Sequence, residues 1–194
     1  RSNILSRLEK YGVKIDSQDP KVQKILDEVK DREFSGYTYD GADASFELLA
    51  NRLLGKVPEY LKVKSYNVSV AKSDTIKTKA NVIFLIDGKD IECNGEGNGP
   101  VNALDNAIRS NFGKVKKYYN FFSDLKLLDY KVRILNTGTE ATTRVLIEST
   151  DKTGVSWFTV GVSPNIIEAS FKALIDSLDY KLYKEKAPAN LNEK

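Results

Sequence analysis

The sequence predicts an α+β fold in which two pseudo-symmetric βββα units form one domain behind a helical linker. The first observation is an internal repeat, because Gly161 follows Gly95 by 66 positions and three small or apolar helix positions recur at the same offset. The second is an alternation of apolar and polar residues in several stretches, which is typical of half-buried strands. A repeat of this kind indicates two supersecondary units that share a core. The repeated helix positions are Ala103, Ala107 and Ile108, then Ala169, Ala173 and Leu174.

Helical patterns dominate the first third of the chain. Ser2 is placed to cap a short helix that ends before Gly12, and Asp19-Pro20 is an N-cap followed by a proline at the first helical position. A third helix opens at Asp43 and stops at Gly55. These helices carry narrow apolar stripes, so we expect them to pack on another part of the protein.

The first unit begins with strands over Leu61–Val70, with a bulge near Ser65, and over Thr75–Asp87. The bulge is expected because the apolar parity switches there. Asp87-Gly88 predicts a hairpin turn, after which Lys89–Asn94 returns as a strand.

The second unit repeats this order. Leu128, Tyr130, Val132 and Ile134 alternate with charged residues, which predicts a strand with these four side chains facing inward. Strands over 141–150 and 155–162 follow, joined by a turn over 151–154. A helix follows Pro100 in the first unit and Pro164 in the second.

These elements divide the chain into three parts. Residues 1–57 form the helical linker, residues 58–182 the repeat domain, and residues 183–194 a polar tail that we expect to fray. Within the repeat domain, the first unit covers residues 58–122 and the second covers residues 123–182.

Composition limits the possible functions. The chain has 194 residues, a net charge of +3 and no histidine, which excludes histidine-based triads and metal sites. No apolar run is long enough to cross a membrane, so we expect no membrane partner. The single cysteine, Cys93, favours a reducing compartment such as the cytoplasm. Methionine is absent even at position 1, so we expect a piece of a longer chain.

The segment Gly95–Pro100 has two interpretations. Its glycines could supply positive φ angles at a tight strand-to-helix corner, with the proline at the first helical position. Alternatively, the corner could also hold an anion, such as an amino-acid carboxylate, on free N–H groups at the helix start. The spacing does not fit a phosphate-binding loop, and the lysine of such a loop is missing.

Other polar groups carry weaker signals. The run Lys114–Tyr119 mixes charge with aromatic residues as nucleic-acid surfaces do, but it is short and flanked by aspartates, so we favour a solvated helix end and expect no nucleic-acid partner. Glu92, Glu96 and Glu148 could act as acid–base pairs, yet nothing in the sequence sets their distance. We therefore predict no catalytic residues and no metal or cofactor in this chain.

Several segments resemble the regulatory domain shared by citramalate synthases and 2-isopropylmalate synthases. Gly97–Leu104 resembles that domain's GxGPVxA signature, and Gly36–Leu49 resembles the segment that precedes it. Ser156–Ser163 with Asn165–Ser170 is more similar to the citramalate branch, and Arg1–Leu5 resembles the stretch after the catalytic barrel. Pro164 departs from the pattern, since many relatives carry a polar or acidic residue there.

The resemblance implies a fragment without catalysis, from an acyltransferase that condenses acetyl-CoA with pyruvate in isoleucine biosynthesis. The divalent metal and its His-x-His ligands would lie in the missing barrel. This part would form a homodimer and bind a branched-chain amino acid, isoleucine or leucine, as feedback inhibitor. The alternatives are a leucine-binding 2-isopropylmalate synthase domain, a nucleic-acid-binding domain and a carboxylate enzyme.

An amino-acid effector needs three kinds of contact, and the sequence offers candidates for each. Helix N-termini could bind the carboxylate, an aspartate the ammonium group, and small or apolar residues the side chain. We expect the first corner to bind better than the second. The candidates for the carboxylate are Asn98, Gly99, Pro100, Val101, Ser163 and Pro164; those for the ammonium group are Asp87 and Asp129; those for the side chain are Ala103, Leu104, Ala107, Tyr130 and Val132.

Overall fold

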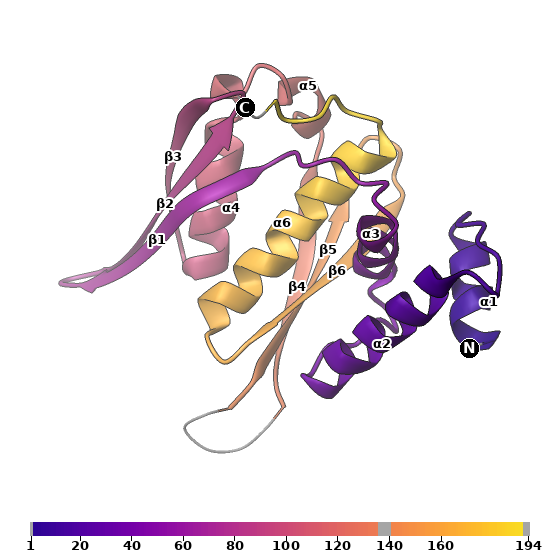
Figure 1. Ribbon diagram of the computed structural model, residues 1–194. Coiled ribbons are helices and arrows are strands. Elements are labelled where there is room, and N and C mark those ends of the chain that lie inside the picture. The colour runs from indigo at the N-terminus through magenta and orange to yellow at the C-terminus, as the bar shows by residue number, and fades with distance from the viewer. Residues whose placement is uncertain (1, 136–140, 192–194) are drawn as a thin grey trace.

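The structure is a computed structural model that describes residues 2–135 and 141–191 (Figure 1). It contains two antiparallel sheets with the strand orders β1-β2-β3 and β4-β5-β6, and a helix follows each sheet. The predicted α+β class with two βββα units is therefore confirmed. The elements are α1 (Ser2–Lys10), α2 (Pro20–Phe34), α3 (Asp43–Leu53), β1 (Lys62–Lys72), β2 (Ile76–Ile86), β3 (Lys89–Gly97), α4 (Pro100–Ser110), a 3₁₀ turn η1 (Phe112–Lys114), α5 (Tyr119–Phe122), β4 (Lys126–Ile134), β5 (Thr143–Thr150), β6 (Ser156–Ser163) and α6 (Ile166–Lys184).

Local sequence signals placed the turns and the bulge correctly. Asp87 and Gly88 have φ angles of 50° and 74°, as a tight hairpin turn between β2 and β3 requires. The register of β1 against β2 shifts between Val63 and Ser65, which confirms the bulge. Sheet two has an equivalent shift between Leu127 and Asp129 that the sequence did not predict.

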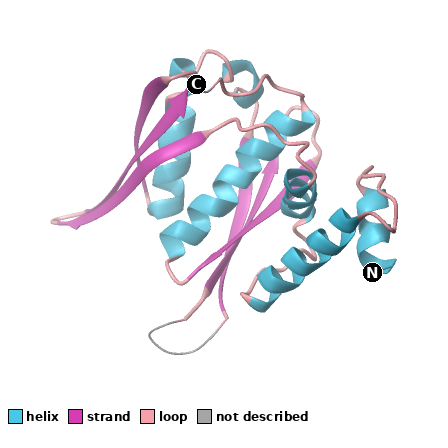
Figure 2. Cartoon of the chain, in the orientation of Figure 1, coloured by secondary structure: helices cyan, strands magenta, loops and turns pink. Residues whose placement is uncertain are grey.

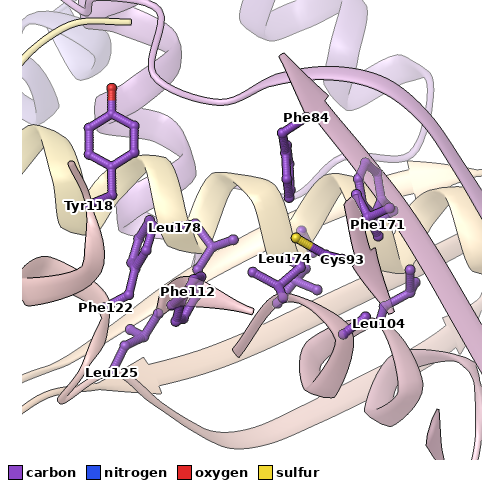
Figure 3. Packing of buried hydrophobic residues seen from close by; sticks show 14 of the residues in the cluster. Phe84, Cys93, Leu104, Phe112, Tyr118, Phe122, Leu125, Phe171, Leu174 and Leu178 are labelled. Atoms are coloured by element: carbon purple, nitrogen blue, oxygen red, sulfur yellow. The ribbon is translucent and has the colours of Figure 1, made fainter. Parts of the chain in front are cut away.

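One hydrophobic core joins the two units. It combines residues of β2, β3 and α4 with residues of β5 and α6, and Figure 3 shows the rings of Phe84 and Phe171 and the side chain of Leu104 within it. Figure 1 shows α6 running between the sheets, and Phe171 of α6 stacks on Tyr66 of β1 with a centroid distance of 4.2 Å. The helix of the second unit thus covers part of the first sheet.

The linker helices pack on the second unit, as their narrow apolar stripes predict. A second core cluster joins α1–α3 to β5 and β6, with Phe46 and Leu49 of α3 on one side and Val160 and Val162 of β6 on the other. Asp19 caps α2 by accepting a hydrogen bond from the Lys21 amide at 2.9 Å. Helix α3 therefore packs against β6, the edge strand of sheet two, and also contacts α6.

The tail after α6 makes specific contacts with the first unit in the part that the structure describes, which ends at Leu191. The side chain of Asn190 accepts from the Asp87 amide and donates to the Leu85 carbonyl, both at 2.8 Å. Tyr118 donates its hydroxyl hydrogen bond to the Pro188 carbonyl at 2.9 Å. This segment straps the end of α6 to the β2–β3 turn of the first unit.

Candidate functional site

The glycines of the first corner do not have the predicted positive φ angles. Gly95 and Gly97 lie inside β3, and none of Gly95, Gly97 and Gly99 is in the left-handed region. A Cβ atom on Gly95 would lie 2.5 Å from the Ala107 Cα, and one on Gly97 would lie 2.5 Å from the Ala103 nitrogen. These glycines are required because α4 lies directly on its own strand, so a side chain has no room.

The second unit uses the same packing. A Cβ atom on Gly161 would lie 2.8 Å from the Ala173 nitrogen and closer still to the Ala169 carbonyl oxygen. The internal repeat is therefore a helix-on-strand contact made by glycine and alanine. Ala103, Leu104 and Ala107 are fully buried, and the two alanines face β3 across this contact.

The two helix N-termini differ in how they are capped. Asn165 caps α6 with its side chain, which accepts from the amides of Ile167 at 2.8 Å and Glu168 at 3.2 Å. Gly99 occupies the N-cap of α4 and makes no side-chain cap, while Pro100 is the first helical residue. In α6 the side chain of Asn165 accepts the hydrogen bonds of the first amides, whereas in α4 no side chain does so. The first turn of α4 therefore still favours binding of an anion.

The residues on either side of the two helix starts were also candidates for carboxylate binding. The Asn98 amide donates to Asn102 Oδ1 at 3.0 Å, which positions the chain before α4, and Val101 is buried in the first turn. Ser163 ends β6 and Pro164 stands before the N-cap of α6, so the helix begins at Ile166.

Asp87 is engaged by groups of its own chain. Its carboxylate accepts from Lys117 Nζ at 2.9 Å and from the Leu191 amide at 2.7 Å. These hydrogen bonds, the one from Leu191 first, lower the pKa of Asp87 below its ordinary value. The sequence suggested that Asp87 binds the ammonium group of an effector, but in the structure the ammonium group of Lys117 occupies this place.

The inward orientation predicted for four β4 side chains is wrong in this chain. Tyr130 is 47% exposed and Val132 is 40% exposed, and Leu128 and Ile134 are also exposed. Tyr130 and Val132 pair with the buried Ile147 and Val145 of β5, so they share the face of sheet two that α6 covers, but they lie beyond the helix. The far ends of β4 and β5 extend past the helices (Figure 2).

The repeat explains why β4 is left uncovered. Phe171 of α6 stacks on Tyr66 of β1, and the position 66 residues before Phe171 is Asp105 of α4. Asp105 instead pairs with Arg109 at 2.9 Å, and Arg109 donates to the Leu125 carbonyl just before β4 at 2.6 Å. Burial raises the pKa of the Asp105 carboxyl although Arg109 opposes this. Sequence reasoning missed Asp105, and aligning the two repeats would have found it.

The remaining polar candidates are not brought into one site. Glu92 and Glu96 lie on β3 of the first sheet, and Glu148 lies on β5 of the second, opposite Asp129 of β4. Lys114 donates to the Glu92 carbonyl at 2.9 Å. Within the residues that the structure describes, no cluster of cysteine, aspartate and glutamate could hold a metal ion, and no helix has the length and apolarity needed to cross a bilayer.

The comparison with known families decides what this arrangement is. The family model of the LeuA allosteric (dimerisation) domain matches residues 40–182. The chain belongs to this family. Its LeuA domain therefore starts just before α3 and includes both βββα units, while α1 and α2 precede it. The strap after α6 follows it.

The chain is similar to curated proteins of two kinds, citramalate synthases and 2-isopropylmalate synthases. The (R)-citramalate synthase of Geobacter sulfurreducens is 46% identical over 189 residues, which are 95% of this chain and 35% of that protein. The (R)-citramalate synthase of Aquifex aeolicus is 43% identical over 190 residues, with the same coverage of 95% and 35%. A 2-isopropylmalate synthase of Aquifex aeolicus is 30% identical over 182 residues, or 92% of this chain and 32% of that protein. The chain thus spans about a third of the length of these curated relatives and corresponds to the C-terminal regulatory domain of the family.

Proposed function

We propose that this chain is the feedback-regulatory and dimerisation domain of a citramalate synthase, and that its effector is a branched-chain amino acid, isoleucine in the first place. The fragment has no catalytic role. The condensation of acetyl-CoA with pyruvate, and the divalent metal that supports it, belong to the remaining part of a longer cytoplasmic protein. The greater identity to citramalate synthases than to the 2-isopropylmalate synthase supports this branch.

The observation that carries the effector proposal is the difference between the two corners. The first turn of α4 has no side-chain cap and can receive a carboxylate, whereas Asn165 occupies the same place in α6. Val101 and Asp105 are one helical turn apart on α4, so a bound amino acid could place its carboxylate at the helix start and its ammonium group near Asp105. Asp87 is paired with Lys117 and Asp105 with Arg109, both at 2.9 Å, and we favour Asp105 for this role because it lies one turn from the start of α4.

The side-chain slot and the dimer interface are proposed to be the same surface. We define the β4 stripe as Leu128, Tyr130, Val132 and Ile134, whose exposed apolar side chains continue the buried face of sheet two. Contiguous exposed apolar surface of this kind marks interaction sites. The family is a dimerisation domain, so a second copy of the chain is the natural partner for the stripe. An effector held between α4 and the stripe would then be closed in by the partner.

Calorimetry tests the proposal directly. The 194-residue chain is titrated with isoleucine, leucine and valine, and sedimentation velocity reports its oligomeric state. We expect a dimer that binds isoleucine most tightly, although shape discrimination against leucine is worth only about 1–3 kcal/mol. Asp105→Asn should weaken binding, whereas Asp129→Asn, on the opposite face of β4, should leave it unchanged. A folded dimer that binds none of the three amino acids would contradict the effector proposal, and tighter binding of leucine would favour the 2-isopropylmalate branch.

A further inference from the structure

A continuous hydrogen-bond network ties α3 to both β6 and α6. The Val160 amide of β6 donates to Ser45 Oγ of α3 at 2.9 Å, and Ser45 Oγ donates to Asp176 Oδ2 of α6 at 2.8 Å. Ser45 is only 3% exposed. Since β6 is an edge strand, its outward amide needs a partner, and Ser45 supplies it. One hydroxyl therefore connects three elements.

Arg52 continues the network two turns along α3. Its Nη1 donates to Asp176 Oδ1 and its Nη2 to Asp179 Oδ2, both at 2.8 Å. The two carboxylates are three residues apart and lie on the same side of α6. Arg52 thus grips α6 at two successive positions. We call Ser45, Arg52, Asp176 and Asp179 the α3–α6 joint.

The two carboxylates that Arg52 contacts differ in their surroundings. Its Oδ1 atom is buried and has no hydrogen-bond partner within the described part of the chain. Burial raises the pKa of Asp179 to about 7 although the Arg52 guanidinium opposes the shift. Arg52 and Asp176 also line a cavity of about 830 Å³ between α2, α3 and α6, while Asp179 does not. The space beside Arg52 thus adjoins Asp176 and not Asp179.

The position of the joint relates the candidate effector site to the linker. Helix α6 contacts α4, whose N-terminus is the proposed effector site, and reaches β1 through Phe171. Helix α3 continues into α2 and α1 at its other end. Helix α3 contacts α6 through Arg52, through Ser45 and through Glu47. Glu47 accepts hydrogen bonds from Tyr180 and Lys184 of α6, both at 3.1 Å. A displacement of α6 therefore reaches α3 through several contacts, and Arg52 is one of them.

We propose that the α3–α6 joint transmits effector binding from the repeat domain to the linker helices, by letting Arg52 change between gripping both carboxylates and gripping Asp176 alone. This inference rests on the proposed effector function, because a signal must exist before a joint can pass it on. Allosteric transmission requires an element with discrete states that both sites bias, and a two-carboxylate grip by one guanidinium has that property.

Hydrogen exchange of the 194-residue chain with and without isoleucine tests the joint, with calorimetry on the same samples. In the unaltered chain we expect isoleucine to change amide exchange across residues 43–53. Arg52→Met should reduce this change, because the Ser45 and Glu47 contacts between α3 and α6 remain, while isoleucine binding is still detected. Arg32→Met is the matched control, since Arg32 pairs with Glu28 inside α2 at 2.6 Å and does not bond to α6. If Arg52→Met fails to fold, Asp179→Asn removes the second grip with little change of shape and should also reduce the response.

The outcomes separate the two proposals. Isoleucine binding with no change in residues 43–53, or an unchanged response in Arg52→Met and Asp179→Asn, would overturn the joint and leave the effector function standing. Failure of the unaltered chain to bind any of the three amino acids would overturn the effector function and the joint with it. A response reduced in the joint variants and kept in Arg32→Met supports transmission through Arg52.

Discussion

Gly161 of β6 faces the backbone of α6 so closely that a Cβ atom on it would lie 2.8 Å from the Ala173 nitrogen. Real Cβ atoms essentially never approach within 3.0 Å, so a side chain at this position requires the helix to move. The equivalent contact of Gly95 with Ala107 in the first unit shows that the repeat preserves a packing distance.

Gly161→Ala should therefore destabilise the domain. Overpacking of this kind costs about 1–3 kcal/mol, and the blocking atoms are backbone that cannot rotate away. Gly113→Ala is the matched control, because Gly113 has no atom within 4 Å of its Cβ position and no positive φ. Urea unfolding of the two variants and the unaltered chain measures the difference. Equal free energies of unfolding for Gly161→Ala and Gly113→Ala would show that α6 is free to shift.

Lys181 is the second position where a single change should be costly. It is 2% exposed and contacts Asp151, with Glu185 at 2.7 Å and Asp124 at 3.4 Å. Burial would lower the pKa of Lys181, but the hydrogen bonds from its ammonium group to Asp151 and Glu185 outweigh burial and raise it. Lys181→Met leaves these carboxylates without their cation, for which a loss of about 3–5 kcal/mol is expected.

The control for Lys181 lies on the same helix. Lys172 pairs with Glu168 at 3.0 Å at an exposed site, so Lys172→Met should cost no more than about 1 kcal/mol. Thermal and urea unfolding of both variants compare the two. A similar loss in both would mean that the Lys181 cluster contributes no more than a surface pair.

Substitution of Tyr130 tests the β4 stripe as the dimer interface. Tyr130→Asp places a charge in the exposed apolar surface, where it can remain solvated in a monomer but would be buried in a dimer. We expect a weaker dimer, by at least tenfold in dissociation constant, since burying a polar group without a partner costs more than about 1.4 kcal/mol. Sedimentation equilibrium measures this change. Lys131→Asp on the opposite face should leave the dimer intact, and equal dissociation constants for both variants would place the interface elsewhere.

Asp179 should make the protein less stable as the pH rises, which is the opposite of the usual effect of an aspartate. Its pKa is about 7 in the folded protein against an ordinary value of 3.8, so the folded state binds the proton more tightly than the unfolded state. Its contribution is most favourable below about pH 4 and is lost as the pH rises to about 7. The charged and titratable groups around it are Arg52 of α3, Asp176 of α6, Glu59 and Tyr60 before β1, and Tyr118.

Asp179→Asn isolates this effect. The substituted side chain cannot lose a proton, so the variant does not share the loss of stability that the unaltered chain shows as the pH rises. The free energy of unfolding of Asp179→Asn minus that of the unaltered chain should therefore increase between about pH 4 and pH 7. Comparing the two chains cancels the opposite contribution of Asp87 and Asp151, whose lowered pKa values favour the folded state as the pH rises. A difference between the two chains that stays constant over this range would show that Asp179 titrates normally.

Local patterns were sufficient to predict most elements of the fold. The hairpin turn at Asp87-Gly88, the bulge at Ser65 and the Asp19 cap all depend on the backbone preferences of a few adjacent residues. The repeat at an offset of 66 residues predicted the two-unit architecture, because each unit needs the same contact between its helix and its strand. These features are visible without knowing which elements touch.

The candidate site could be predicted only in part, because its properties depend on contacts between distant residues. The alternation along β4 was visible, but whether its apolar face is covered depends on α6 and α4, and α4 carries Asp105 where α6 carries Phe171. The role of the corner glycines was likewise misjudged, because the sequence cannot show that Gly95 lies against Ala107.

The sequence by itself determined the two βββα units, the β2–β3 turn, the Asp19 cap of α2, the absence of histidine and the resemblance that the family match confirmed. Only the tertiary structure decided that the apolar side chains of β4 stay exposed, and that Arg52 contacts two carboxylates of a helix more than 120 residues away. The physical reason is range: backbone preferences and periodicity act over a few residues, whereas burial, close packing and ionic contacts depend on which surfaces the folded chain brings together.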